Sequence, residues 1–118
     1  MEESKRQKQV ARLIQEEMTT IFQKEGLNMV QGGMISISKV VVTPDLLEAR
    51  IHLSFFKISD HNALLQLVRE KTGELRGALG SKLRHQLRRI PELQFFEDDT
   101  LEHASKIEEL LSKIRKED

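Results

Sequence analysis

Apolar residues recur at helical spacing early in the chain and change to alternation after residue 33. The first stripe consists of Val10, Leu13, Ile14, Met18, Ile21 and Phe22. It predicts a helix from about Ser4 to Lys24. Ser4 and Gln7 have the spacing of a capping box at its start, and Gly26 stands where a C-cap glycine belongs. Residues 28–33 indicate a loop.

Alternation with a period of two predicts a pair of strands. Residues 49–55 alternate apolar and polar side chains, as a half-buried strand does. The strand before it shifts phase near Ser38 and Lys39, where we expect a β-bulge. Pro44 and Asp45 are turn residues between the two strands, so we expect an antiparallel hairpin.

Two helices follow the hairpin. Ser59 or Asp60 caps the first of them. The second repeats leucine at every fourth residue from Leu75 to Leu87. Pro91 ends this helix, because its fixed ring and missing N–H cannot continue one.

A short strand and a last helix complete the predicted order. The strand covers residues 92–96, and Asp99 or Thr100 caps the helix. The order α-β-β-α-α-β-α predicts an α+β domain with a three-stranded sheet and helices on one of its faces. A length of 118 residues suits a single domain, residues 1–118.

The composition excludes several classes of protein. There is no cysteine, which excludes disulfides and fits a reducing compartment. The first nine residues lack the apolar stretch of a signal peptide, and no apolar run approaches the length that spans a bilayer. We expect a cytoplasmic protein that does not contact membranes, and a monomer.

The charge is balanced in total but uneven along the chain. Lysine plus arginine and aspartate plus glutamate each number 19. Residues 71–89 hold six basic residues against one acidic residue, whereas residues 92–118 hold nine acidic against four basic. Two interpretations remain open at this point, a polarised binding surface and two solvated helix faces of opposite sign.

No arrangement of residues indicates catalysis. The four histidines lie on different predicted elements, without metal-ligand spacing. The acidic residues 97–99 are typical of a helix N-terminus, where carboxylates favour the dipole. No nucleophile elbow, P-loop or dinucleotide fingerprint occurs. We therefore expect no enzymatic activity, no cofactor and no metal site.

Gly77 and Gly80 have the spacing of the Gly-x-x-Gly loop by which KH domains hold RNA. The leucine period runs straight through them, so they are predicted to form the small-residue face of a helix instead. Arg84 and Arg88, one turn apart beside this face, would grip phosphates. Alternatively, the glycines admit another helix and the arginines are only solvated. Aromatic residues for base stacking are scarce, which favours recognition of RNA backbone and shape.

Two segments carry a family resemblance. They are "SKVVVTPDLLEARIHLSFF" and "LRGALGSKLRHQLRRIPELQFFEDDTLEHASKIEELL". The chain resembles bacterial ribosome-binding factor A over nearly its whole length. The resemblance implies a type II KH-like fold, α-β-β-α-α-β with an additional C-terminal helix. It also implies a non-catalytic assembly factor that binds the free small (30S) ribosomal subunit, supports late maturation of its rRNA including 5′-end processing, and matters for growth in the cold.

The resemblance also implies a kink between the second and third helices. In this family an Ala-x-Gly kink replaces the KH loop, and here it falls on Lys71, Thr72 and Gly73, with lysine in place of the alanine. Thr72 is a candidate cap for the third helix. The predicted RNA-binding residues are Lys71, Arg76, Lys82, Arg84, Arg88 and Arg89, with Lys5, Arg6 and Arg12 as weaker candidates.

A second class of function stays open. In it the protein is an interaction module whose acidic last helix docks a basic ribosomal partner, and the arginine face is solvated surface. The partner expected in either case is the small ribosomal subunit, through its rRNA or through its proteins.

Overall fold

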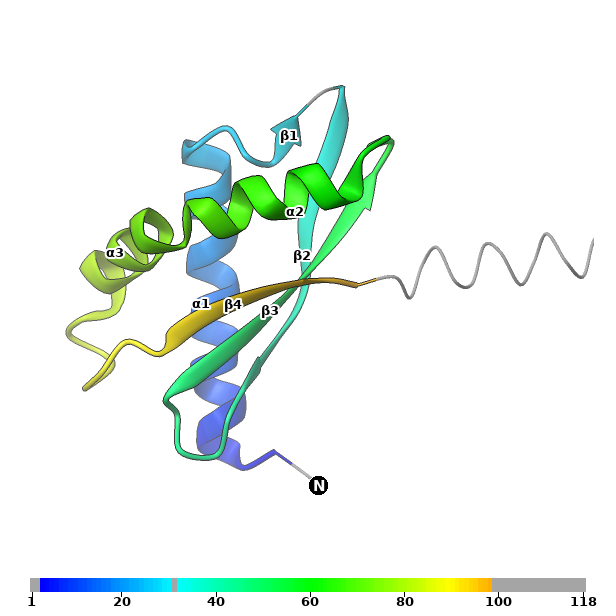
Figure 1. The fold of residues 1–118 in the computed structure, drawn as a ribbon. Coiled ribbons are helices and arrows are strands. Elements are labelled where there is room, and N and C mark those ends of the chain that lie inside the picture. Colours follow the sequence, from blue (N-terminus) through cyan, green and yellow to red (C-terminus); the bar gives the residue numbers. More distant parts are fainter. Residues whose placement is uncertain (1–2, 31, 99–118) are drawn as a thin grey trace, which may run out of the picture.

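The computed structural model describes residues 3–30 and 32–98 (Figure 1). Their elements in chain order are α1 (Lys5–Lys24), β1 (Met29–Val30), β2 (Gly33–Val42), β3 (Glu48–Phe56), α2 (His61–Glu70), α3 (Thr72–Leu83) and β4 (Glu92–Glu97). The helix predicted after Asp99 or Thr100 lies outside the described residues. The α+β class is confirmed, and the predicted order up to β4 is confirmed except that the structure adds the strand β1.

Local sequence signals set the ends of α1 and α2 as predicted. The Gln7 N–H donates to Ser4 Oγ at 3.1 Å, and the Ser4 N–H donates to Gln7 Oε1 at 2.7 Å, which completes the capping box. Gly26 follows the last turn of α1 with φ +72°, a left-handed conformation that favours glycine. Asp60, rather than Ser59, caps α2 by accepting the Ala63 N–H at 3.0 Å.

The sheet has four strands in the order β1-β2-β3-β4. β2 and β3 are antiparallel with a register shift between Ile37 and Lys39, so the predicted hairpin and bulge are confirmed. β4 joins β3 in parallel. The prediction of three strands, with a loop over residues 28–33, was wrong, because β1 pairs with the start of β2. A strand of two residues has no periodicity from which to predict it.

One face of the sheet carries the core. Along β3 the side chains from Ala49 to Phe55 at every second position are buried, whereas Arg50 and Phe56 on the other face are exposed. All three helices share one apolar cluster with the buried face, and α1 packs against β2 and α3. The prediction of helices on one face is therefore confirmed.

α3 ends earlier than its leucine repeat predicts. The helix stops at Leu83 with Arg84 as its C-cap, and not just before Pro91. Leu87 is nevertheless buried, and its N–H still donates to the Leu83 carbonyl at 2.9 Å. The leucine repeat therefore extends to Leu87, because the hydrogen bond between Leu83 and Leu87 has helical spacing. The residues after Leu83 are nevertheless outside the helix. Gly77 and Gly80 lie inside α3, as predicted.

Candidate nucleic-acid interface

A shallow depression of about 310 Å³ gathers arginines from two distant parts of the chain. We call it the basic hollow. Its lining residues are Arg6 and Val10 of α1, Asp45, Leu46 and Leu47 of the β2–β3 turn, and Leu87, Arg88, Arg89 and Pro91 after α3. The hollow therefore forms where the start of α1, the hairpin turn and the chain leaving α3 meet.

Buried neighbours hold these arginines in place. Leu87 is buried against the core, and Arg88 and Arg89, which follow it directly, are exposed at the surface. Val10, one turn after Arg6, is also buried. The arginine side chains are thus exposed while their backbones are anchored.

The charge of the hollow is mostly uncompensated. Arg6, Arg88 and Arg89 make no ion pair with any other residue of the described ranges. One acidic residue, Asp45, lines the hollow, and its pKa is lowered by hydrogen bonds from the Thr43 hydroxyl and the Leu47 N–H. Asp45 is therefore ionised near neutral pH, and three arginines face one carboxylate.

Arg89 has acidic neighbours on its other side. It also borders a second depression that contains Glu48 and Glu92. Arg6 and Arg88 are not part of that depression, so they carry the least neutralised charge of the hollow.

Arg84 and Lys82 lie at the end of α3 and are exposed. The prediction that Arg84 and Arg88 share one helix face was wrong, because the helix ends at Leu83. Arg84 caps the helix, and Arg88 belongs to the segment that lines the hollow.

Two other predicted RNA-binding residues have contacts within the protein. Arg76 donates to the carbonyls of Ile90 and Pro91 at 2.7 and 3.1 Å, which fixes the chain as it enters β4. The Lys71 ammonium lies 4.0 Å from the Glu74 carboxylate.

α2 and α3 meet at Lys71, which ends one helix and precedes the other with φ −92° and ψ 5°. Thr72 does not cap α3, contrary to the prediction, and its hydroxyl donates to the Arg69 carbonyl at 2.7 Å. A Cβ on Gly73 would meet no atom within 4 Å. The Lys71 side chain at this bend is partly exposed.

The small-residue face of α3 is open. Gly73 and Gly77 line a hollow of about 400 Å³ together with Arg76 and Ile90. A Cβ on Gly77 would meet nothing within 4 Å, whereas one on Gly80 would lie 3.6 Å from Ile90. Within residues 3–30 and 32–98, no other helix packs on Gly77. Its backbone is accessible to a ligand.

The predicted RNA-binding residues of α1 divide into two groups. Arg6 lines the basic hollow, while Lys5 and Arg12, seven residues apart, follow a different stripe of the helix. Arg12 also pairs with Glu16 at 3.2 Å. Arg6 was predicted from the sequence only as a weaker candidate, and the turn residues 45–47 were not predicted. No local pattern in the sequence indicates that these residues meet Arg88 and Arg89 in the folded protein.

The histidines and acids form no catalytic arrangement in the described ranges. His61 contacts Glu97, and His52 stacks on Phe96 with ring centres 5.6 Å apart. No group of three or more potential metal ligands occurs among the residues that the structure describes. None of the helices described above is long and apolar enough to cross a bilayer.

The order α1-β2-β3-α2-α3-β4, with a one-residue break between α2 and α3, is that of a KH-like α+β domain. Comparison with known sequences is more specific. The chain belongs to the ribosome-binding factor A family, whose family model matches residues 6–111.

Relatives named ribosome-binding factor A cover nearly the whole chain. The protein of Cytophaga hutchinsonii is 44% identical and covers 98% of this chain and 90% of its own length. The protein of Chlorobium luteolum is 41% identical and covers 98% of this chain and 96% of its own.

Solved structures of proteins with this name share the fold. A crystal structure of the Thermus thermophilus protein matches with a TM-score of 0.65 at 14% identity, covering 77% of this chain and 94% of that one. A solution structure from Thermotoga maritima matches with a TM-score of 0.67 at 20% identity, covering 85% and 93%. A Thermus thermophilus homology model fitted into a cryo-EM map of a 30S complex matches with a TM-score of 0.56 at 18% identity, covering 82% and 96%.

Proposed function

We propose that this protein binds the free small (30S) ribosomal subunit through ribosomal RNA and supports late maturation of that RNA, including processing of its 5′ end. Family membership supports a ribosome-binding factor. The Thermus thermophilus protein fitted into a map of a 30S complex supports the small subunit as the partner. The proposal extends to a cytoplasmic, monomeric protein without catalytic activity, in which residues 1–118 form one domain. We also propose that the protein is needed most for growth in the cold.

The basic hollow is the observation that carries the RNA contact. Arg6, Arg88 and Arg89 converge there from separate segments without ion pairs to the rest of the described chain. Guanidinium groups suit phosphate oxygens, and the anchored backbones reduce the entropy lost on binding. Lys82 and Arg84 are also exposed, at the end of α3 from which the chain runs to the hollow, and the open backbone at Gly77 admits a close approach by RNA.

The mechanism is steric and electrostatic. The factor binds an immature conformation of the RNA more tightly than the mature one, which shifts the population toward productive folding. It dissociates when the mature form no longer fits. No bond in the RNA is made or broken by the protein in this scheme.

Co-sedimentation with purified small subunits, large subunits and assembled ribosomes across a salt series tests the proposal. We expect binding to free small subunits only, with a log–log salt slope of about −3 to −4 if roughly four phosphates are neutralised. Equal binding to all three particles would indicate nonspecific affinity for polyanions and contradict the proposal.

Charge reversal separates RNA binding from the competing interaction module. Arg84→Glu with Arg88→Glu should abolish binding to small subunits, whereas Lys24→Glu with Lys39→Glu, a charge-matched pair at the end of α1 and in β2, should retain it. Intact binding after the first change, with loss when the acids within residues 97–109 are neutralised, would favour the docking module instead.

A further inference from the structure

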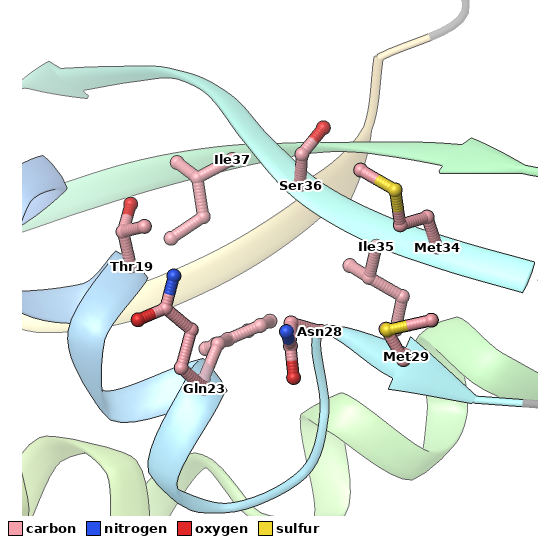
Figure 2. Close-up of a pocket in the computed structure, with 9 residues that line it drawn as sticks. Thr19, Gln23, Asn28, Met29, Met34, Ile35, Ser36 and Ile37 are labelled. Atoms are coloured by element: carbon pink, nitrogen blue, oxygen red, sulfur yellow. The ribbon is translucent and has the colours of Figure 1, made fainter.

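The end of α1 opposite the basic hollow borders a second depression, which we call the edge groove. It encloses about 240 Å³ between the last turns of α1, residues 28 and 29, and the outer edge of β2. Figure 2 shows Thr19 and Gln23 at one end of the groove and Met29 and Met34 at the other. Among the described residues, no charged side chain lines it.

One backbone group of β2 is unpaired at this groove. β1 covers β2 only as far as Ile35, whose N–H donates to the Asn28 carbonyl at 2.9 Å. Alternate residues of a strand direct their backbone groups to the same side, so the N–H of Ile37 also points outward. Leu53, opposite Ile37, directs its carbonyl away from β2, where it accepts the N–H of Asp98, the residue that follows β4, at 2.7 Å. The Ile37 N–H therefore has no partner in residues 3–30 and 32–98.

The groups beside this edge suit a peptide backbone. The Ile37 carbonyl accepts from Gln15 Nε2 at 3.5 Å, which is long for a hydrogen bond. The side-chain amides of Gln23 and Asn28 make no hydrogen bond within the described ranges, and each offers both a donor and an acceptor. An extended chain would accept the Ile37 N–H and donate to the Ile37 carbonyl, as an added strand does.

The rim and floor of the groove suit an apolar side chain. Met29 is 70% exposed and Met34 is 49% exposed, and they are paired across β1 and β2. Flexible methionines adapt to a partner's side chain. The floor contains the buried Phe22 and Ile35. RNA would find no cation here for its phosphates, so the groove chemistry favours a peptide over RNA.

We propose that the edge groove binds a short extended segment of a protein partner. The segment pairs with the backbone of Ile37 and packs an apolar side chain against Met29 and Met34. Arg6 in the basic hollow and Gln23 in the edge groove lie about 25 Å apart along α1, so both surfaces can be occupied together. No residue of the basic hollow takes part in this contact. Peptide binding at the edge groove should therefore persist when RNA binding at the basic hollow is lost.

Titration of the isotope-labelled protein with a capped pentapeptide of alternating threonine and valine, followed by NMR, tests this inference. We expect saturable shifts at the Ile37 N–H and at the side-chain amides of Gln23 and Asn28. The same peptide with its central valine N-methylated should bind at least about fivefold more weakly, since it loses a backbone hydrogen bond.

Two kinds of variant test the contacts. Ile37→Pro removes the outward N–H, which an edge strand tolerates, and should weaken binding about fivefold to tenfold relative to Ile37→Ala. Met29→Gln with Met34→Gln changes exposed side chains only and should weaken binding similarly, whereas Leu67→Gln, an exposed leucine of α2, should not. These variants keep the test valid if the proline variant fails to fold.

Three results would overturn the proposal. One is the absence of saturable shifts at millimolar peptide. Another is the same set of shifts with a short single-stranded RNA, which would assign the groove to nucleotides. The third is concentration-dependent dimerisation, measured by sedimentation, that removes the Ile37 signal without peptide and assigns the edge to a second copy of the chain.

Discussion

The two ends of α1 differ in surface chemistry although they belong to one helix on one core. At the first end, Arg6 meets Arg88 and Arg89 over a buried Leu87, and the charge is left largely uncompensated. At the other end, a neutral groove exposes methionines and an unpaired strand edge. A net charge of zero therefore conceals a separation of surfaces, one suited to a polyanion and one to an uncharged chain.

The largest expected effect is a loss of stability at Gly33, beside the edge groove. A Cβ on Gly33 would lie 2.5 Å from the Phe56 carbonyl oxygen and 2.6 Å from that of Lys57, both backbone atoms with little freedom to move. Gly33→Ala should lower the free energy of unfolding by about 2–3 kcal/mol, measured by urea denaturation. Peptide binding at the edge groove should weaken, because Gly33 begins β2 and pairs with β1.

Because the basic hollow lies at the opposite end of α1, the folded fraction of the Gly33→Ala protein should keep its affinity for small subunits. An equal loss of affinity at both ends would mean that the two surfaces are coupled through the sheet.

The next effect concerns the basic end. Replacing Arg6 and Arg88 together by alanine should weaken small-subunit binding about 30-fold, at roughly 1 kcal/mol for each lost phosphate contact. The matched pair Lys5→Ala and Arg12→Ala also removes two cations, but from the stripe outside the hollow, and should weaken binding only slightly. Co-sedimentation at fixed salt measures both. Equal losses would show that total charge matters and the hollow does not.

Much of the fold could be predicted because its signals are local. The Ser4 and Gln7 box, the Asp60 cap and the bulge before Lys39 each depend on neighbouring residues, and each is confirmed. The end of α3 was predicted wrongly, since the buried Leu87 keeps the helical period after the helix has ended.

The candidate surfaces were harder to predict than the elements. The basic hollow joins Arg6 to Arg88 across the core, and the edge groove depends on β1, two residues long. Charge along the sequence indicated Arg88 and Arg89, but only the packing of α1 against α3 brings Arg6 to them. Neither surface has a periodic pattern, because each is made of loops and element ends.

A smaller effect separates stability from binding on α3. Gly77 lies in the interior of α3 with open space around its Cβ position, so Gly77→Ala should raise the free energy of unfolding by about 0.5–1 kcal/mol. If RNA approaches the helix backbone there, the same methyl group should weaken small-subunit binding. A variant that is more stable and binds equally well would remove Gly77 from the interface and restrict the contact to the arginines.

The smallest effect lies between the two ends, at His52 in the middle of β3. Burial and the nearby charge of Lys39 lower the pKa of His52, with Asp98 opposing and Arg50 adding to the change. The folded protein therefore holds a neutral imidazole where the unfolded chain, with an ordinary pKa of about 6.5, begins to bind a proton. Stability should decline as the pH falls below that value, and this contribution should level off below the folded-state pKa.

Urea denaturation at pH 7.5 and pH 5.5 measures this term. The wild type should lose more stability between the two than His52→Gln does, while His85→Gln, which removes an exposed histidine, should behave as the wild type. Asp45, whose pKa is also lowered, loses its contribution only when the pH falls toward the ordinary carboxyl pKa of about 3.9, below the range from pH 7.5 to pH 5.5. Because His52 belongs to neither surface, affinity at both ends should be unchanged by its replacement at pH 7.5. A loss at one end alone would assign His52, and the Phe96 ring stacked on it, to that surface.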